Sequence, residues 1–346
     1  MIELDGAMHS GSGTLVRFGV ALAALAGRPL RVVNARARRQ KPGLAPQHVA
    51  AVRASADLCG AQTQGVEVGA RSFEFVPGPR ISGGEFVWSI GTAGSATMLA
   101  LGLLPLACFA DRPLRARITG GVFQDFAPSP HHLGNVLLPL LSRMGVTAEL
   151  EVRRPGYVPG GEGTIELRLQ PAQRALSGLV LLDPGSVAEV RGVALASHLA
   201  ERRVAERMAE SCAAALAARG LRTRIEIVND SDASQPGASL AIWAESSTGC
   251  RFGADRAGAP RRSAEAIGRF VARAFLEDLA SGATTDRHLA DQLVIFAGIA
   301  EGVSRFSVPQ VSGHVESNLW LAQLFGASVR RDGSRIEITG SGQRPR

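Results

Sequence analysis

Lysine is nearly absent from this sequence, because Lys41 is the only lysine among its 38 basic residues. An enzyme that adenylates a lysine, or forms a Schiff base on one, would therefore have to use Lys41. No GxxxxGK[ST] sequence surrounds Lys41, which excludes a Walker-type phosphate-binding loop. Any nucleotide chemistry in this chain must be carried by histidine, arginine and backbone groups.

Closely spaced cysteines and long apolar runs are lacking too. The four cysteines form no CxxC pair and show no metal-ligand spacing. The longest apolar stretch, Met98 to Ala110, is shorter than the roughly 20 residues that cross a bilayer. The first residues, Met1 to Gly6, have neither the basic start nor the apolar run of a signal peptide. We expect a cytoplasmic protein without a membrane partner.

Basic residues outnumber acidic residues, 38 to 31. The formal net charge is +7 and the calculated pI is about 10.3. Such a balance favours an anionic partner, of which nucleic acid is the commonest. An excess of arginine over lysine can also reflect nucleotide bias in a genome, so the charge alone leaves both explanations open.

An internal repeat organises the 346 residues. The segment Ala26 to Val32 (AGRPLRV) recurs as Ala110 to Ala116 (ADRPLRA) at an offset of 84, and His48 and His132 keep the same offset. Each copy follows an apolar helical stretch, leads into an alternating strand and continues into a second helix. The predicted helices are 15–25, 47–59, 96–109 and 132–144; the predicted strands are 30–35 and 114–119, with paired strands in 65–76 and 147–169.

A third, shorter copy is predicted near the end of the sequence. It has helices at 289–300 and 317–325, a strand at 305–308, and a closing hairpin at 328–339 around Asp332-Gly333. His314 lies immediately before its second helix. The region between the second and third copies reads as a strand, a helix, two strands and a long helix. We therefore expect an α/β (α+β) fold with three similar units in 1–181 and 280–346, and a smaller α/β insert at 182–279.

Seven motifs, spread from position 5 to position 318, resemble those of the RNA 3'-terminal phosphate cyclases. They occur in the family's order and spacing, and together they cover almost the whole chain. In this sequence they are Asp5-Gly6 with Gly11, Gly13 and Arg17; Arg36 to Leu44 with Gln47-His48; Gly91 to Ser95; Gly120-Gly121 with Ala127-Pro128; Tyr157 to Gly163; Ala244 to Cys250; and Leu289 to Leu293 with His314, Ser317 and Asn318.

The resemblance implies three βαβαββ-like repeats with an α/β insert between the second and third. It also implies an enzyme, a nucleotidyl-transfer ligase, that uses ATP and Mg²⁺ or Mn²⁺ to convert an RNA 3'-phosphate into a 2',3'-cyclic phosphate. In such an enzyme His314 would attack ATP to form histidyl-AMP, because a neutral imidazole is both a nucleophile and a good leaving group.

The same resemblance assigns nucleotide-binding roles to seven further residues. Two arginines would engage phosphates, where a planar guanidinium can hold two oxygens, and a glutamine would donate to the α-phosphate. Two residues would sandwich the adenine, with two more close by. In that order, the residues are Arg17 and Arg39; Gln47; Pro128 and His288; and Asp291 and Gln292. No residue is assigned as a metal ligand, and the oligomeric state is left open.

Several positions depart from the family pattern. Ser10 stands in place of an acidic residue that is a plausible metal ligand, and Ser12 in place of a glycine. Leu101 and His288 replace a glutamine and a tyrosine near the adenine, and His131 replaces an aspartate. These changes leave three possibilities: an active divergent cyclase, a cyclase-like RNA-binding protein without catalysis, and an enzyme with altered nucleotide or acceptor specificity. Without the resemblance, Arg17 on an apolar helix would be expected to extend its charge to solvent.

Overall fold

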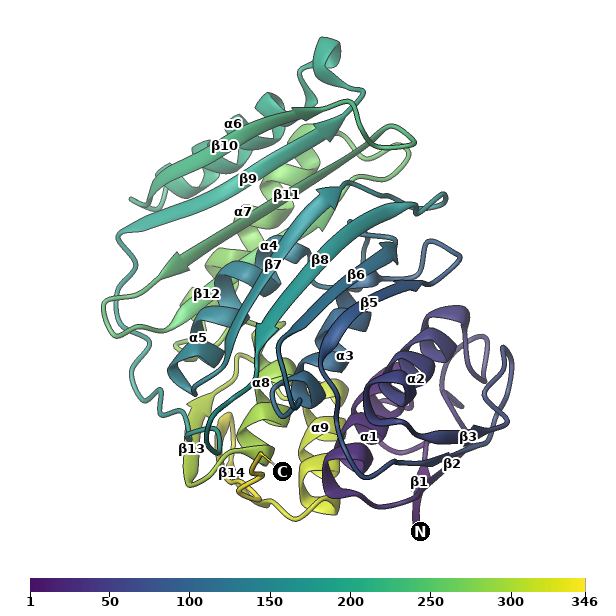
Figure 1. Ribbon diagram of the computed structural model, residues 1–346. Helices are drawn as coiled ribbons and strands as arrows, with labels where there is room; N and C mark the ends of the chain where they lie inside the picture. The colour runs from purple at the N-terminus through teal and green to yellow at the C-terminus, as the bar shows by residue number, and fades with distance from the viewer. Residues whose placement is uncertain (346) are drawn as a thin grey trace.

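The computed structural model describes residues 1–345 as a mixed α/β protein with four small sheets (Figure 1). The first unit has strand order β1-β2-β4-β3, with β1 parallel to β2 and the remaining neighbours antiparallel. Helices α1 and α2 pack against one another beside this sheet. The elements are β1 (Ile2–Asp5), α1 (Gly13–Ala26), β2 (Leu30–Val33), α2 (Pro46–Cys59), β3 (Gln62–Gln64) and β4 (Phe73–Val76).

The second unit repeats this order with strands β5-β6-β8-β7, and again its first two strands are parallel. Its second helix contains a π-helical turn, η1, between two α-helical parts. The elements are β5 (Gly84–Ser89), α3 (Ala96–Ala107), β6 (Leu114–Gly120), α4 (Pro130–His132), η1 (Leu133–Leu137), α5 (Leu138–Arg143), β7 (Thr147–Arg154) and β8 (Gly163–Gln170).

A third sheet, of order β13-β15-β14, is built near the end of the chain. Residues 177 and 180, which precede a long excursion of the chain, form isolated parallel bridges to Glu301 and to Arg305 of β13. This segment therefore lies beside β13 as β1 lies beside β2. The elements are α8 (Leu289–Ile299), β13 (Val303–Ser307), α9 (Gly313–Leu324), β14 (Ser328–Asp332) and β15 (Arg335–Thr339).

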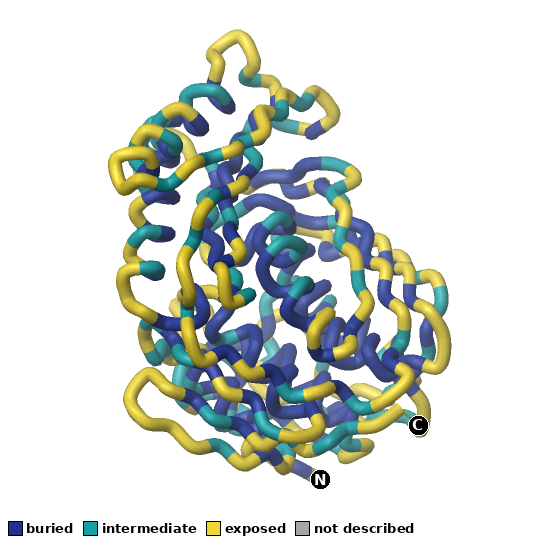
Figure 2. The backbone as a smooth tube through the Cα atoms, turned by 90° about the vertical axis from the view of Figure 1, so that its left-hand side faces the viewer, coloured by how far each residue is buried: buried dark blue, intermediate teal, exposed yellow. Residues whose placement is uncertain are grey.

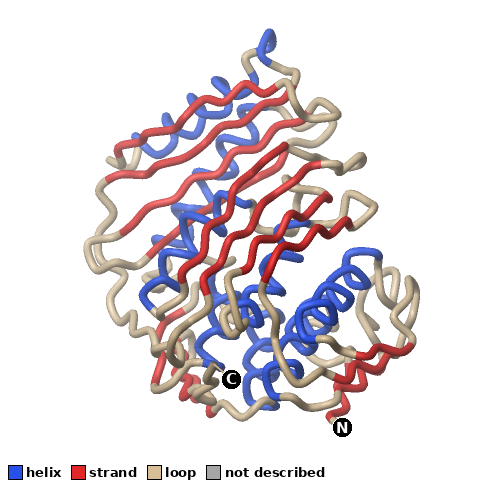
Figure 3. The backbone as a smooth tube through the Cα atoms, viewed as in Figure 1, coloured by secondary structure: helices blue, strands red, loops and turns tan. Residues whose placement is uncertain are grey.

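The excursion between these parts forms the fourth sheet, of order β10-β9-β11-β12. Two amphipathic helices, α6 and α7, pack together on one face of it (Figures 1 and 3). The elements are β9 (Glu189–Ser197), η2 (Ala200–Arg202), α6 (Val204–Ala217), β10 (Arg222–Asp230), β11 (Gly237–Glu245), β12 (Arg251–Ala257) and α7 (Ala264–Ala280).

A column of aromatic rings joins the fourth sheet to the second unit. His131 stacks between Phe123 and Trp243, with ring centroids 5.7 and 6.4 Å apart, and Phe123 also stacks on Tyr157. Figure 2 shows that buried residues concentrate in the interior elements, whereas exposed ones follow the outer loops. These contacts hold the fourth sheet on a continuous hydrophobic core.

Most of the expected elements occur within a few residues of their expected bounds. Three strands were not expected: β1, β5 and β12. One position also needs correction, because His314 lies inside the first turn of α9 and not before the helix.

Candidate functional site

The amino-terminal ends of four helices meet on one side of the molecule. Ser12, the N-cap of α1, has its Oγ 3.4 Å from Nδ1 of His314 in the first turn of α9. Gln47, in the first turn of α2, accepts at Oε1 a 2.9 Å hydrogen bond from the backbone N–H of Ser95, the N-cap of α3. Helix α1 packs against the other three helices. Because each helix start carries partial positive charge, this region attracts phosphate groups.

Arg17 on α1 is a buried cation inside this region. It is only 6% exposed, and its Nε has no hydrogen-bond partner. Within residues 1–345 no carboxylate forms a salt bridge with it. The expectation that its charge reaches solvent is therefore wrong. Two glycines make room for the side chain, because a Cβ on Gly13 would lie 3.1 Å from a guanidinium nitrogen and one on Gly102 would lie 3.4 Å from the aliphatic stem.

Arg17 and Asp291 perturb one another across the buried space between α1 and α8. Burial lowers the pKa of Arg17 to about 10, although the charge of Asp291 opposes the shift. Burial raises the pKa of Asp291 to about 7, and Arg17 limits that rise. A carboxyl group with this pKa is only partly ionised near neutral pH, so it cancels the charge of Arg17 only in part. A buried guanidinium in this state is suited to an anion brought from outside.

His314 keeps an exposed edge beside these positive groups. Burial of the rest of its ring, followed by the charges of Arg17 and Arg39, lowers its pKa below the usual value. The imidazole is therefore neutral near pH 7, which leaves one ring nitrogen with a free lone pair. His48 shares the environment: burial, then the charges of Arg17 and Arg36, lower its pKa to about 2.

In the basic loop between β2 and α2, two arginines are bonded to backbone carbonyls, and two other cations are exposed. Arg36 donates to the carbonyls of Lys41 and Gly43 at 3.1 and 2.6 Å, and Arg38 donates to the carbonyl of His9 at 2.6 Å. The side chains of Arg39 and Lys41 are exposed and form no ion pair with any described residue. Arg39 and Lys41 are thus available to a ligand, whereas Arg36 maintains the loop.

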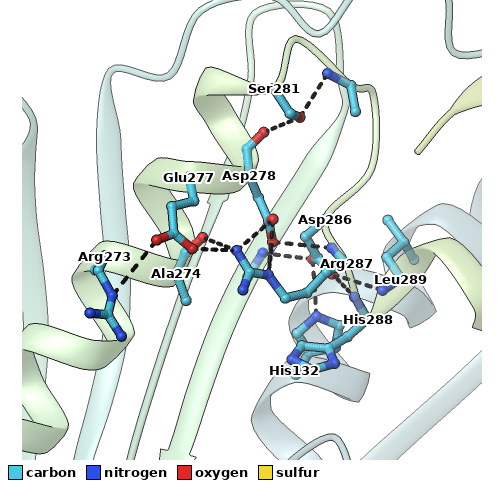
Figure 4. A network of polar contacts seen from close by, with 12 residues as sticks. His132, Arg273, Ala274, Glu277, Asp278, Ser281, Asp286, Arg287, His288 and Leu289 are labelled. Carbon is cyan, nitrogen blue, oxygen red and sulfur yellow. Dashed lines mark hydrogen bonds and ion pairs between the residues drawn. The ribbon is translucent and has the colours of Figure 1, made fainter. Parts of the chain in front are cut away.

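His288 is positioned by a buried carboxylate at the start of α8 (Figure 4). Asp286 accepts hydrogen bonds from the backbone N–H groups of His288 and Leu289, at 2.8 and 2.7 Å, and from Nε2 of His132 at 3.0 Å. The ring of His132 meets that of His288 edge-on, with centroids 5.8 Å apart. Sequence reasoning missed Asp286, although an acid before an apolar helix is a recognisable capping signal.

His288 lines a pocket of about 150 Å³ together with the segment 124–127. Pro128, which follows this segment, is buried and does not line the pocket. Asp291, in the first turn of α8, interacts electrostatically with Arg17, Asp286 and His132.

Two buried polar residues, Gln292 of α8 and Asn318 of α9, differ in how they are bonded. Gln292 is 3% exposed, and its Oε1 has no partner among the described residues. Asn318 donates through Nδ2 to the carbonyl of Asp291 at 2.7 Å and accepts at Oδ1 from the hydroxyl of Thr14 at 3.1 Å. These bonds fix the starts of α1 and α9 relative to α8. The sequence-predicted residues Arg17, Gln47, Asp291 and His314 thus lie in one region.

Comparison with known proteins decides the family. Residues 8–330 match the model of the RNA 3'-terminal phosphate cyclases. The chain belongs to the RNA 3'-terminal phosphate cyclase family. It is 36% identical over 330 residues to the RNA 3'-terminal phosphate cyclase of Methanopyrus kandleri, covering 94% of this chain and 93% of that protein. The corresponding protein of Nitrosospira multiformis is 37% identical over 326 residues, covering 94% and 91%.

A similarity to a solved structure is much weaker. The enolpyruvyl transferase NikO from Streptomyces tendae aligns with a TM-score of 0.41 and 13% identity, over 99% of this chain and 49% of that one. Similarity at this level says nothing about activity. No helix within residues 1–345 is both long enough and apolar enough to cross a membrane.

The departures from the cyclase pattern have structural counterparts. Ser10 and Ser12 join a cluster of hydroxyl groups next to His314, with their Oγ atoms 2.9 Å apart. Leu101 is buried in α3, and His131 takes part in the aromatic column of the fourth sheet. The replacement of the aspartate by His131 therefore substitutes stacking for charge at that contact.

The donor groups around His314 do not fit a divalent cation held by the protein. Magnesium and manganese prefer carboxylate oxygens, and the described residues contain no group of three or more His, Cys, Asp or Glu placed to hold a metal. Asp125 is bound by Arg262 at 2.8 Å and by Arg256 at 3.3 Å. Glu316 faces His9 and Arg331. Neither acid is free to replace the one absent at Ser10.

Proposed function

We propose that this protein converts the 3'-terminal phosphate of an RNA into a 2',3'-cyclic phosphate at the expense of ATP. One observation carries the proposal: a neutral, accessible imidazole, His314, lies within range of the charge of Arg17, a buried guanidinium that forms no salt bridge with any of residues 1–345. A buried unpaired cation is costly to a fold. A phosphate group bound next to Arg17 would supply the missing negative charge and offset that cost.

In the first step, a ring nitrogen of His314 attacks the α-phosphorus of ATP. A P–N bond forms, the P–O bond to pyrophosphate breaks, and the positive charge passes to the imidazole ring. Arg17, Arg39 and the surrounding helix starts would stabilise negative charge on the phosphates. Gln47 supports this step, because Ser95 holds its carbonyl oxygen and leaves its NH₂ group to donate.

In the second step, an oxygen of the RNA 3'-phosphate attacks the same phosphorus and displaces His314 as neutral imidazole. The RNA then carries AMP on its terminal phosphate. In the third step, the neighbouring 2'-oxygen attacks the RNA phosphorus as its hydroxyl loses a proton, and AMP leaves with its phosphate. Adenylation is needed because it turns an unreactive phosphate oxygen into part of a good leaving group.

The adenosine and the RNA would occupy opposite sides of His314. We assign the base of ATP to the pocket beside His288, with Pro128 behind its wall and Asp291 and Gln292 between base and phosphates. The exposed Arg39 and Lys41 would meet the RNA backbone through their charges.

We also infer the division of the chain from its topology. Two units have the order βαβαββ with matching strand orders, and the bridges of residues 177 and 180 to β13 and its neighbour supply a matching first strand for the third. This supports three repeats in residues 1–181 and 280–346, with residues 182–279 inserted after the first strand of the third repeat.

The decisive experiment is covalent labelling with ATP carrying a labelled α-phosphate, in the presence of Mg²⁺ or Mn²⁺. We expect an acid-labile, alkali-stable label that is lost in His314→Ala and kept in Gln323→Ala, at the other end of α9. Transfer of the label to an RNA 3'-phosphate and release of a cyclic end complete the test. No label on the wild-type protein, together with RNA binding that weakens steeply with salt, would instead indicate a binding protein without catalysis.

A further inference from the structure

Three serine hydroxyls form a continuous chain that ends at His314. The Oγ atoms of Ser317 and Ser10 are 2.7 Å apart, those of Ser10 and Ser12 are 2.9 Å apart, and Ser12 Oγ lies 3.4 Å from Nδ1 of His314. We call Ser317, Ser10 and Ser12 the serine chain. The cyclase pattern has an acid and a glycine at the positions of Ser10 and Ser12, so this arrangement departs from that pattern.

The direction of the proton donors along the serine chain is set at Ser317. A hydroxyl has one proton to donate and two lone pairs that accept. Ser317 donates to the carbonyl of Gly313 at 2.8 Å and accepts from the backbone N–H of Ser10 at 3.2 Å. Its proton is then used, so the remaining contact must be a bond that Ser317 accepts from the hydroxyl of Ser10.

Counting the hydroxyl protons in the same way gives the donor in each of the next contacts, as far as His314. Ser10 has donated its proton to Ser317, so in the 2.9 Å contact Ser12 is the donor and Ser10 the acceptor. Ser12 then has only lone pairs left. One accepts from the backbone N–H of Thr14 at 3.4 Å, and the other faces Nδ1 of His314. That contact is a hydrogen bond only when Nδ1 carries the proton.

From this order we infer that Ser12 is a positioning residue, which holds His314 in the tautomer with a proton on Nδ1 and a free lone pair on Nε2. The inference rests on the proposed function for its consequence: Nε2 would attack the α-phosphorus of ATP. The lone pair of Nε2 forms the P–N bond while Nδ1 keeps its proton, so no proton transfer is needed. The hydrogen bond to Ser12 then strengthens as the ring becomes positive, which favours the charged intermediate.

The serine chain also accounts for what replaces the missing acid. A carboxylate beside Nδ1 would stabilise the protonated ring and raise the pKa of His314, whereas neutral hydroxyls do not add that charge. His314 can therefore keep its low pKa and still be held in a single tautomer. The nucleophile is kept neutral by burial and by the charges of Arg17 and Arg39, and it is oriented by Ser12.

The tautomer can be observed directly, without any activity measurement. Protein containing ¹⁵N-labelled histidine is recorded by NMR at a pH where His314 is neutral, and the His314 ring signals are assigned by their loss in His314→Ala. We expect a protonated Nδ1 and an unprotonated Nε2 in the wild type. Ser12→Gly and Ser12→Ala should shift the ring toward the opposite tautomer, whereas Ser263→Ala, which removes the N-cap of α7 and no contact of His314, should not.

The rate of self-adenylation supplies the second measurement. Both Ser12 variants should slow label formation by about 2- to 10-fold, the effect expected for one hydrogen bond. Because Ser12 is also the N-cap of α1, Ser12→Ala should lower the unfolding midpoint no more than Ser263→Ala does, whereas Ser12→Gly should leave it nearly unchanged. A proton on Nε2 in the wild type would overturn the inference, and so would a tautomer unaffected by Ser12→Gly. If the wild type shows the expected tautomer but never takes up label, the proposed function fails and the positioning by Ser12 stands.

Discussion

His48 and His132 occupy the same third position of equivalent helices, α2 and α4, yet their pKa values shift in opposite directions. Burial and the charges of Arg17 and Arg36 lower the pKa of His48 to about 2. Burial also acts to lower the pKa of His132, but the charge and hydrogen bond of Asp286 outweigh it and raise the value. The same position of the repeat thus holds a neutral histidine, His48, in the first unit. In the second unit it holds His132, which forms an ion pair with Asp286 near His288.

The ion pair of His132 and Asp286 should contribute a stability that depends on pH. Removing one partner in His132→Ala leaves a buried carboxylate unpaired, which should cost about 3–5 kcal/mol in the free energy of unfolding. Because the pKa of His132 is higher in the folded state than its usual 6.5, its contribution is complete below about pH 6.5 and is lost as the pH rises through the folded value. Denaturant unfolding of wild type and variant between pH 6 and 9, roughly, measures this.

A difference in stability that stays constant over this pH range would contradict the assignment of a charged His132. His132→Gln serves as a second variant, because its amide can still donate to Asp286 without a charge. It should recover part of the lost stability and show no such pH dependence.

Arg17 should lower the stability of the ligand-free protein while supporting its activity. In Arg17→Met the buried guanidinium is replaced by an apolar chain of similar length, and we expect a gain of about 1–3 kcal/mol in the free energy of unfolding of the ligand-free protein. Self-adenylation should fall by about 100-fold or more, because a charge that stabilises the transferring phosphates is lost. Unfolding and labelling rates are measured on the same preparations.

Arg28, which is exposed beyond the end of α1, provides the matched control: Arg28→Met should alter neither property appreciably. Loss of stability in Arg17→Met would mean that Arg17 is compensated within the fold, and the argument for a missing phosphate would lose its basis.

Asp291 should make self-adenylation respond to pH near neutrality. Its pKa is raised to about 7, so raising the pH through 7 adds a negative charge beside Arg17. We expect the apparent affinity for ATP to fall by up to about tenfold across this range, the effect of one pKa unit of coupling. Asp291→Asn should behave like the protonated form at every pH, with a flat profile between roughly pH 6 and 8.

The Asp291→Asn variant also tests how the stability of the protein changes with pH. A carboxyl whose pKa is higher in the folded state than its usual 3.8 binds more protons when folded, so wild-type stability falls as the pH rises from about 4 to 7. Asp291→Asn should escape this fall and be more stable than the wild type above pH 7. Parallel profiles for the two proteins would show that Asp291 does not titrate in this range.

Gln47 should act through its NH₂ group alone, since its carbonyl oxygen is held by the backbone N–H of Ser95. Gln47→Ala should reduce kcat/KM for ATP by about 10²- to 10³-fold, as for other single donors to a transition state, with a small change in unfolding midpoint. Gln62→Ala, on an exposed strand of the same unit, is the control. Equal losses in both variants would point to general destabilisation.

Much of the fold could be read from the sequence because its signals are local. The recurrence of GRPLR and DRPLR, each between an apolar helix and an alternating strand, predicted the first two units, and α1, α3, β2 and β6 lie close to the expected bounds. Strand β12 was missed because Arg251 to Ala257 (RFGADRA) holds three charged residues and a glycine. It becomes a strand only by pairing with β11, a contact that no local pattern records.

The candidate site, too, was only partly predictable from the sequence. The resemblance of the motifs to those of the cyclases selected His314, Arg17, Gln47 and Asp291, of which His314, Gln47 and Asp291 lie in the first turns of α9, α2 and α8. Their charge states could not be predicted, because a pKa depends on burial and on charges that arrive from distant parts of the chain. Asp286 had no motif, and its role became evident only from its bonds to His132 and to the start of α8.

The sequence by itself determined the repeat, the family resemblance and the dependence on histidine and arginine, since these follow from residue types and spacing. Tertiary structure decided that Arg17 is buried with no salt bridge to any of residues 1–345, that His314 is neutral, and that three serines lead to its ring. The physical reason is that burial and hydrogen-bond direction are properties of the surroundings in space, and residues 10 and 317 become neighbours only when the chain is folded.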